Sequence, residues 1–256
     1  MLRAILGFSL VLGVHCVAPS FAVSAELDEI EQRGYLVVAV KDNWRPLGFR
    51  DETGTLVGLE IDIARQLAIE LFGDPNAVEL KPVSNLERLS VVLNDEVDVA
   101  IAGVTMTEAR SRLVSFSIPY YLDGTGIITR NPEIQHNQDL HGRRIGVLEN
   151  SSAIALMRYF YPSATLVSTD SYHQALSQLE NSQADAFAGD VSVLAGWVQE
   201  HPEYKILPSL VSAEPLGIVI PKGTQFSPLR RQINQSIQSW IDSGWLDERA
   251  DYWGLP

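Results

Sequence analysis

The stretch VDVAIAGVTMTEAR, residues 97–110, places a short apolar run directly before a loop of small residues. Residues 97–101 predict a buried strand, and Thr107 has the position of an N-cap for a short helix through Arg110. Backbone amides, the hydroxyls of Thr105 and Thr107, and the Arg110 guanidinium would then converge, as in a carboxylate-binding loop. A single Arg in a first helical turn is more often a solvated surface charge, so a binding role needs support from the rest of the chain.

The N-terminal segment, residues 1–25, has the pattern of a secretory signal peptide that is cleaved before Glu26. One cation, Arg3, precedes an apolar run over residues 4–14, which is too short to span a bilayer comfortably. Cys16 is the only cysteine and lies in this segment, in a poor match to a lipobox. We therefore expect an exported mature protein without a disulfide or a lipid anchor.

Composition excludes several classes of function. The 256 residues include 19 Lys and Arg against 32 Asp and Glu, a formal net charge of −13. Such a surface repels nucleic acid and anionic lipid, so no nucleic-acid partner is expected. The sequence contains no serine, histidine and acid set, no metal-spaced His and Cys cluster and no phosphate loop. We accordingly expect no catalytic residues, no metal ligands and no cofactor.

Short β-rich runs alternate with helical stretches along the chain, which predicts α/β layers with mostly parallel sheets. The strand candidates are residues 35–40, 78–83, 97–101, 144–148, 165–168 and 185–188. Apolar stripes predict helices at Ile63, Leu67, Ala68 and Leu71, at Ala155, Leu156, Tyr159 and Phe160, and at Ala175, Leu176 and Leu179.

These alternations form two series, residues 35–115 and 143–207, separated by extended segments. The pattern predicts a two-lobed clamshell with a double-stranded hinge and a cleft at the carboxyl ends of the strands. The expected division is a first lobe at 26–124, a hinge crossing at 125–130, a second lobe at 131–212, a hinge return at 213–220 and a C-terminal part of the first lobe at 221–256.

Four segments, in this order along the chain, resemble the bacterial extracellular solute-binding proteins of family 3. They are GLEIDIARQLA at 58–68, residues 97–110 with FSIPYY at 116–121, ADAFAGD at 184–190, and YWG at 252–254. The resemblance implies a periplasmic binding protein of the type II-like class. It also implies a monomeric receptor that carries a free L-amino acid to the permease of an ABC transporter in the inner membrane.

The resemblance also assigns the main contacts of the ligand carboxylate. Arg110 would bind the α-carboxylate bidentately, assisted by the Thr105 amide and by Ser151 and Ser152 at the start of a second-lobe helix. Glu149 and Asn150 depart from the glycine-rich loop that is common in the family at that place, which leaves the second-lobe contacts open.

The ligand ammonium and the cover of the site follow in the same way. Asp190 would bind the α-ammonium, assisted by the carbonyl of Gly103, where the missing Cβ allows close backbone approach. Trp44 would cover the ligand. The alternatives are that Asp190 is the N-cap of a helix over residues 191–199 and that Trp44 packs in the core.

Two cations distinguish the side-chain end of the site. By the resemblance, Lys41 stands where several glutamine or histidine receptors carry an acid, and Arg88 matches a basic position of the acidic amino-acid receptors. Together they imply a second carboxylate on the ligand, so glutamate or aspartate is favoured, with glutamine or another polar amino acid as the alternative. Arg88 could instead be a solvated charge paired with Glu87 or Glu180, and Lys41 could point past the cleft. A small slip in the alignment would exchange Lys41 and Asp42.

Two other classes of function share this fold. An enzyme resembling the cyclohexadienyl or arogenate dehydratases would need a general acid in the cleft, for which Glu149 or Asp42 could be nominated. A sensor domain would dock on a membrane kinase. Because a binding role already accounts for the same residues, we expect a receptor and not an enzyme.

Overall fold

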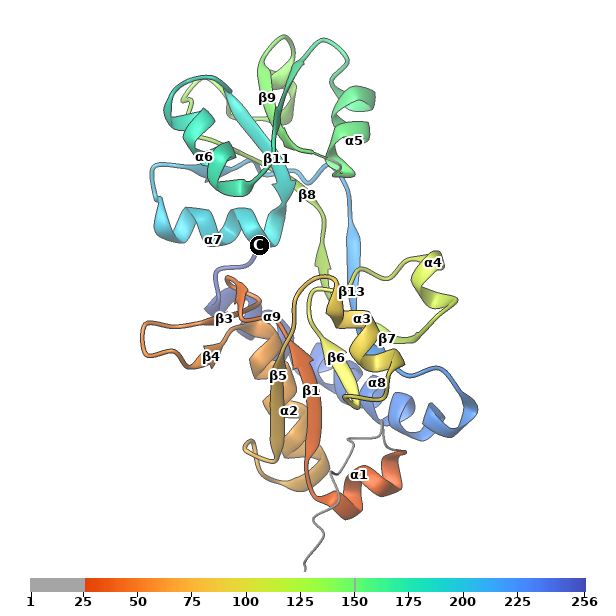
Figure 1. Cartoon of the computed structure of the whole chain (residues 1–256). Helices are drawn as coiled ribbons and strands as arrows, with labels where there is room; N and C mark the ends of the chain where they lie inside the picture. Colours follow the sequence, from red (N-terminus) through yellow and green to blue (C-terminus); the bar gives the residue numbers. More distant parts are fainter. Residues whose placement is uncertain (1–25, 150) are drawn as a thin grey trace, which may run out of the picture.

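The computed structural model describes residues 26–149 and 151–256 as two α/β lobes, which Figure 1 shows one above the other. The two-lobed α/β fold predicted from the sequence is confirmed. The predicted signal peptide, residues 1–25 with Cys16, lies outside the described residues, as does Asn150. No helix in the described ranges is long and apolar enough to cross a membrane.

The first lobe is built on a five-stranded sheet of order β5-β1-β6-β13-β7. Its strands are β1 (Leu36–Val40), β5 (Val78–Pro82), β6 (Val99–Ile101), β7 (Ser115–Asp123) and β13 (Glu214–Ile220). A small sheet adds β2 (Asn43–Trp44), β3 (Gly48–Arg50) and β4 (Leu56–Val57). The helices are α1 (Leu27–Arg33), α2 (Leu59–Phe72), α3 (Glu87–Leu93), α4 (Glu108–Ser111), α8 (Ser227–Asp242) and α9 (Trp245–Tyr252), with a 3₁₀ turn at Thr224–Phe226.

The second lobe repeats this plan with a sheet of order β10-β9-β11-β8-β12. Its strands are β8 (Thr125–Thr129), β9 (Arg144–Leu148), β10 (Thr165–Thr169), β11 (Ala186–Asp190) and β12 (Lys205–Ile206). The helices are α5 (Ala153–Phe160), α6 (Tyr172–Glu180) and α7 (Val191–Glu200), with a 3₁₀ turn at Asn137–Leu140. In each sheet three strands are parallel, and the strands nearest the crossings, β13 and β8, join them in antiparallel pairs.

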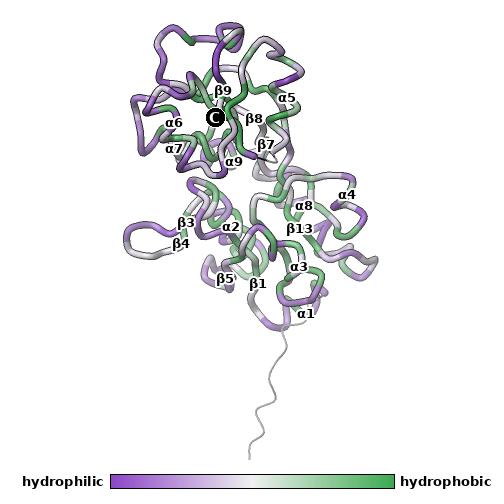
Figure 2. The backbone as a smooth tube through the Cα atoms, turned by 45° about the horizontal axis from the view of Figure 1, so that its top comes forward, coloured by the Kyte–Doolittle hydropathy of each residue, from purple (hydrophilic) through white to green (hydrophobic). Residues whose placement is uncertain are grey.

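Apolar clusters cover both faces of the first-lobe sheet, and its strand β1 is apolar throughout. In β1, Leu36, Val38 and Val40 pack in one apolar cluster, and Val37 and Ala39 pack in another. Figure 2 shows hydrophobic residues along the strands of both lobes and hydrophilic residues in the outer loops. A continuous apolar strand is typical of a sheet that carries helices on both sides.

Helix α5 forms where the sequence predicts it, but it buries a different face. Ala153 and Met157 are buried, whereas Tyr159 is 79% exposed and Phe160 is 48% exposed. The two exposed rings contact each other edge to face, with their centroids 4.9 Å apart. The helix carries two apolar stripes, and only its position against the sheet decides which one is buried.

The chain passes between the lobes at two short, adjacent segments. Asp123 ends β7 and Thr125 begins β8, and the return runs through residues 211–214 into β13. A Cβ on Gly124 would overlap the carbonyl of Ser212, so the close approach of the two crossings requires glycine. The predicted crossing at 125–130 falls on β8, and the predicted return at 213–220 falls on β13. The division of the chain into lobes at these bounds stays a prediction.

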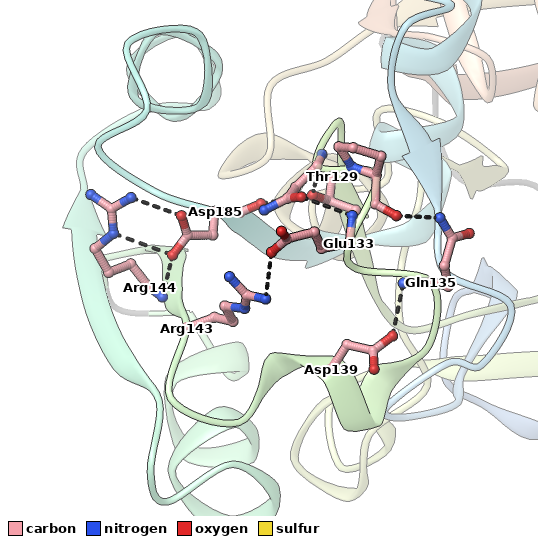
Figure 3. Close-up of polar contacts among 9 residues, drawn as sticks. Thr129, Glu133, Gln135, Asp139, Arg143, Arg144 and Asp185 are labelled. Atoms are coloured by element: carbon pink, nitrogen blue, oxygen red, sulfur yellow. Dashed lines mark hydrogen bonds and ion pairs between the residues drawn. The ribbon is translucent and has the colours of Figure 1, made fainter.

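Polar contacts fix the end of the second lobe that lies away from the crossings (Figure 3). Asp185 accepts a hydrogen bond from the Arg144 amide at 2.8 Å and another from the Arg144 guanidinium at 2.7 Å. These bonds hold the pKa of Asp185 below its usual range. The hydroxyl of Thr129 donates to the Asp185 carbonyl at 2.7 Å, which joins the end of β8 to the start of β11.

Asp123 joins the crossing to the first turn of α7. Its carboxylate accepts hydrogen bonds from the Gly124 amide at 2.9 Å, the Ser192 amide at 3.2 Å and the Ser192 hydroxyl at 2.7 Å. Asp123 is only 5% exposed, and burial raises its pKa to about 6 although the hydrogen bonds act against this rise. The charge of the neighbouring Asp190 raises the pKa of Asp123 further.

We predict that Asp123 makes stability depend on pH in mildly acidic solution. Its folded-state pKa of about 6 lies above the ordinary value of 3.8, so the folded protein keeps a proton that unfolding releases. The stabilisation is present below pH 4 and should be lost as the pH rises to 6, by up to about 3 kcal/mol. Denaturant unfolding of wild type and Asp123→Asn across this interval measures the change.

The informative quantity is the difference in unfolding free energy between wild type and Asp123→Asn. Glu60 and Asp190 also have pKa values raised by burial, so the wild type alone does not isolate Asp123. A difference that stays constant from pH 4 to pH 7 would contradict the assignment.

Candidate functional site

A cavity of about 700 Å³ lies between the lobes. Its first-lobe wall consists of Lys41, Asn43, Trp44, Arg45, Ser84, Asn85 and Leu86, and its second-lobe wall of Leu148, Tyr172, Asp190, Val193, Gly196 and Trp197. Lys41 follows the last residue of β1, and Leu148 and Asp190 end β9 and β11. The cavity therefore lies at the carboxyl ends of parallel strands, where open α/β sheets bind ligands.

The predicted site residues divide into two groups around this cavity. Lys41, Trp44 and Asp190 line it, whereas Arg88, Gly103, Thr105, Arg110, Ser151 and Ser152 are not part of its lining. Gly103 nevertheless adjoins the wall, because a Cβ there would lie 2.8 Å from the ring of Trp44. Gly103 also has φ of +61°, a conformation that favours glycine.

Of Lys41 and Asp42, only Lys41 lines the cavity. Lys41 is 3% exposed, lines the cavity and donates from Nζ to the carbonyl of Val83 at 2.8 Å. Burial lowers the pKa of Lys41, and the positive charge of Arg88 lowers it further. Asp42 pairs with Arg50 at 3.3 Å and is absent from the cavity lining.

Arg88 is bonded to the loop that follows β6. Its Nη1 donates to the carbonyl of Ala102 at 3.0 Å and to the carbonyl of Gly103 at 2.6 Å. Burial lowers the pKa of Arg88, and the nearby Arg110 lowers it further. The sequence could not have revealed these bonds, because they depend on how closely α3 approaches the loop.

The loop at residues 104–107 has the cap predicted from the sequence. The Thr107 hydroxyl accepts from the Arg110 amide at 3.3 Å, so the N-cap of α4 is confirmed. Arg110 donates from Nη1 to the carbonyl of Thr105 at 2.8 Å. The Met106 amide donates to the carbonyl of Pro215 at 2.8 Å, which attaches the loop to strand β13.

Glu60 is a residue of this region that sequence reasoning missed. It lies in the first turn of α2, is fully buried, and accepts from the Gly103 amide at 2.6 Å and the Tyr120 hydroxyl at 2.5 Å. Its second carboxylate oxygen, Oε2, has no hydrogen-bond partner among the described residues. Burial raises the pKa of Glu60. An acid inside an apolar helical stripe was the available signal, since such a residue is rarely buried without a role.

Asp190 does not act as a helix cap. It occupies the N-cap position of α7, yet its side chain makes no capping bond. The amide of Ser192 is instead satisfied by Asp123, and Asp190 accepts from the Tyr172 hydroxyl at 3.2 Å. Burial raises the pKa of Asp190, while the Tyr172 bond and the charge of Arg88 lower it. Asp190 therefore lines the cavity, and its carboxylate can accept hydrogen bonds besides the one from Tyr172.

The loop between β9 and α5 contributes none of Glu149, Ser151 and Ser152 to the cavity lining. The hydroxyl of Ser151 is buried and has no partner among the described residues, and Ser152 precedes α5 without making a capping bond. Glu149 accepts a long bond of 3.4 Å from Ser168 and is not in the cavity lining. No group of three His, Cys, Asp or Glu side chains in the described ranges is arranged to hold a metal ion.

Three cations in and beside the cavity share one property, whereas Arg45 in the cavity wall pairs with Glu200 at 3.4 Å. In the described part of the chain, Lys41, Arg88 and Arg110 form no ion pair with a carboxylate and donate only to backbone carbonyls. Asp190 is the acidic residue in the cavity lining. This arrangement provides separate places for a carboxylate and for an ammonium group.

Comparison with known proteins gives a consistent result. The family model described as bacterial extracellular solute-binding proteins, family 3, matches residues 36–256. The glutamine-binding protein of Geobacillus stearothermophilus is 33% identical over 202 residues, which cover 78% of this chain and 77% of that protein. The ABC transporter glutamine-binding protein GlnH of Bacillus subtilis is 28% identical over 230 residues, which cover 89% of this chain and 84% of that protein.

Solved structures agree with the sequence comparison. An ancestral cationic amino-acid solute-binding protein superposes with a TM-score of 0.75 and 27% identity. The match covers 89% of this chain and 99% of that chain.

We predict that removal of the Glu60 carboxylate destabilises the first lobe. Glu60→Ala would leave the Gly103 amide and the Tyr120 hydroxyl buried without an acceptor, at a cost of about 1–3 kcal/mol for each. Glu60→Gln keeps an acceptor oxygen, so its free energy of unfolding should lie nearer to wild type. Urea unfolding measures the stability of both variants, with Glu31→Ala, at an exposed residue of α1, as the control. Equal effects of the Ala and Gln variants would contradict this role.

Proposed function

The chain belongs to the bacterial extracellular solute-binding proteins of family 3, and we propose that it is a periplasmic receptor that binds one free L-amino acid. In this proposal the two lobes close around the ligand, and the loaded receptor delivers it to the permease of an ABC transporter. The protein acts as a monomer and carries out no chemical step.

The observation that carries the proposal is a cavity between the lobes with Lys41 in the first-lobe wall and Asp190 in the second-lobe wall. Arg110 and the Thr105 amide form the carboxylate subsite of the first lobe, and Asp190 forms the ammonium subsite of the second lobe. Asp190 supports this role because its side chain faces the cavity and caps no helix. A zwitterion held by one group from each lobe would favour the closed arrangement, since its full binding energy is available only there.

The ligand that we favour is acidic, glutamate or aspartate. Lys41 and Arg88 are two further cations without a carboxylate partner among the described residues, and a second ligand carboxylate would compensate them. The glutamine-binding relatives support glutamine as the alternative ligand. Glutamine offers an acceptor oxygen at the same end of the molecule but no charge.

The candidate general acids of the enzyme alternative support a binding role instead. Asp42 pairs with Arg50, Glu149 accepts from Ser168, and neither side chain is part of the cavity lining. A general acid must reach the atom that it protonates within hydrogen-bond distance.

A calorimetric screen of the twenty amino acids tests the proposal, and two variants test its residues. Arg110→Ala and Asp190→Ala should each make the binding free energy of the best ligand less favourable by about 2–5 kcal/mol, because each leaves a charged ligand group unpaired in a closed cleft. The loss should be similar for every amino acid that binds. Near wild-type affinity in a folded variant would exclude the altered residue from the site.

The acidic preference can be tested through Lys41. We expect wild type to bind glutamate more tightly than glutamine, and Lys41→Met to reduce the ratio of the two affinities about tenfold, because only glutamate loses a charge partner. The ratio is informative because any general loosening of the cleft affects both ligands alike. Lys222→Met, at an exposed lysine that donates to the Ser111 and Arg112 carbonyls, is the matched control. Tighter glutamine binding in wild type would assign the receptor to the alternative ligand.

A further inference from the structure

The guanidinium of Arg88 bonds to the Gly103 carbonyl, which the family resemblance assigns to the ligand ammonium together with Asp190. Its Nη1 is 2.6 Å from the carbonyl oxygen of Gly103, the shortest of its bonds. Asp190, the other assigned acceptor, raises the pKa of Arg88, and Arg88 in turn lowers the pKa of Asp190. One internal cation therefore interacts with both parts of the ammonium subsite.

We infer that Arg88 is an internal substitute for the ligand ammonium, and that an amino acid binds by displacing Arg88 from the Gly103 carbonyl. This inference rests on the proposed function, because it assumes that the ligand is an α-amino acid held by Asp190 and Gly103. It adds a competing group inside the site and a reason for selectivity.

Displacement follows from the electrostatics of two cations at one acceptor. An ammonium bonded to Gly103 would lie directly beside the guanidinium of Arg88, and like charges at contact distance repel strongly away from water. Arg110 already lies near enough to lower the pKa of Arg88, so a third positive charge adds to an existing repulsion. Lys41 is also close, since the charge of Arg88 lowers its pKa.

Arg88 needs a new partner once it leaves the carbonyls of Ala102 and Gly103. A half-buried guanidinium without an acceptor is costly, so the free energy of binding includes this loss unless the ligand replaces the bonds. The side-chain carboxylate of glutamate and the amide oxygen of glutamine can both replace them. Alanine cannot, because its side chain ends in a methyl group. The exchange of partners therefore selects amino acids with an acceptor on the side chain and rejects short or apolar ones.

The test compares glutamate and alanine in wild type and in Arg88→Met by calorimetry. Methionine has a similar length but neither charge nor donor, so it leaves the Gly103 carbonyl free. We expect glutamate affinity to fall about tenfold or more and alanine affinity to rise about threefold or more, a change of opposite sign for the two ligands. Arg112→Met is the matched control, because Arg112 is an exposed arginine of the same lobe that pairs with Glu108 at 2.7 Å.

The outcomes separate this inference from the proposed function. Alanine affinity that falls or stays unchanged in a folded Arg88→Met, while glutamate affinity falls, would overturn displacement and leave an acidic amino-acid receptor standing. A wild-type protein that binds no amino acid would instead overturn the proposed function. If Arg88→Met does not fold, Arg88→Lys is the second variant, because lysine keeps the charge but has a more flexible side chain that holds the Gly103 carbonyl less firmly. It should change the two affinities in the same two directions by smaller factors. Uniform loss of both ligands in Arg88→Lys would overturn the inference.

Discussion

The buried carboxylate of Glu60 is the interaction on which the first-lobe side of the cleft depends. Through Oε1 it joins the first turn of α2 to the Gly103 amide and to the Tyr120 hydroxyl of β7. Once the amide of Gly103 is directed inward, the peptide is fixed with φ of +61°, and the carbonyl of the same residue is presented to Arg88. The ring of Trp44 packs on the bare Cα, so loop, wall and cation are positioned by one buried acid.

The charge of the cleft is a local property that differs from that of the whole chain. The chain carries a formal net charge of −13, yet Lys41, Arg88 and Arg110 gather at one end of the first sheet and bond only to carbonyls. Such an arrangement is unfavourable by itself, because the three cations repel one another and none of them forms a direct ion pair with a described carboxylate. An anionic ligand would relieve that repulsion.

Much of the fold could be predicted from the sequence, because strand and helix periodicity is a local property. All six predicted strands are present, and Thr107 caps α4 as expected. Strand β7 is not among the six predicted strands. It contains Pro119, whose missing amide donor is tolerated because β7 lies at the edge of the sheet. The prediction of the buried face of α5 was wrong for a different reason. Two apolar stripes compete on that helix, and only tertiary packing selects one.

The site was less predictable than the fold. The residue types at Arg110 and Asp190 follow from a linear pattern, but the partner of Arg88 is set by the distance between α3 and the loop after β6, which no pattern records. The partners of Glu60 were equally unpredictable, because this residue lies in a helix whose other buried residues form an ordinary apolar stripe.

The two tryptophans that line the cavity give the cleft an optical property. Trp44 belongs to the first lobe and Trp197 to the second, so one indole faces the gap from each side. Indole emission depends on the polarity of its surroundings, so the closure that we propose would change the environment of both rings. The remaining tryptophans, Trp240, Trp245 and Trp253, pack against the first-lobe core. The native protein would then report that closure by its own fluorescence, with no label added.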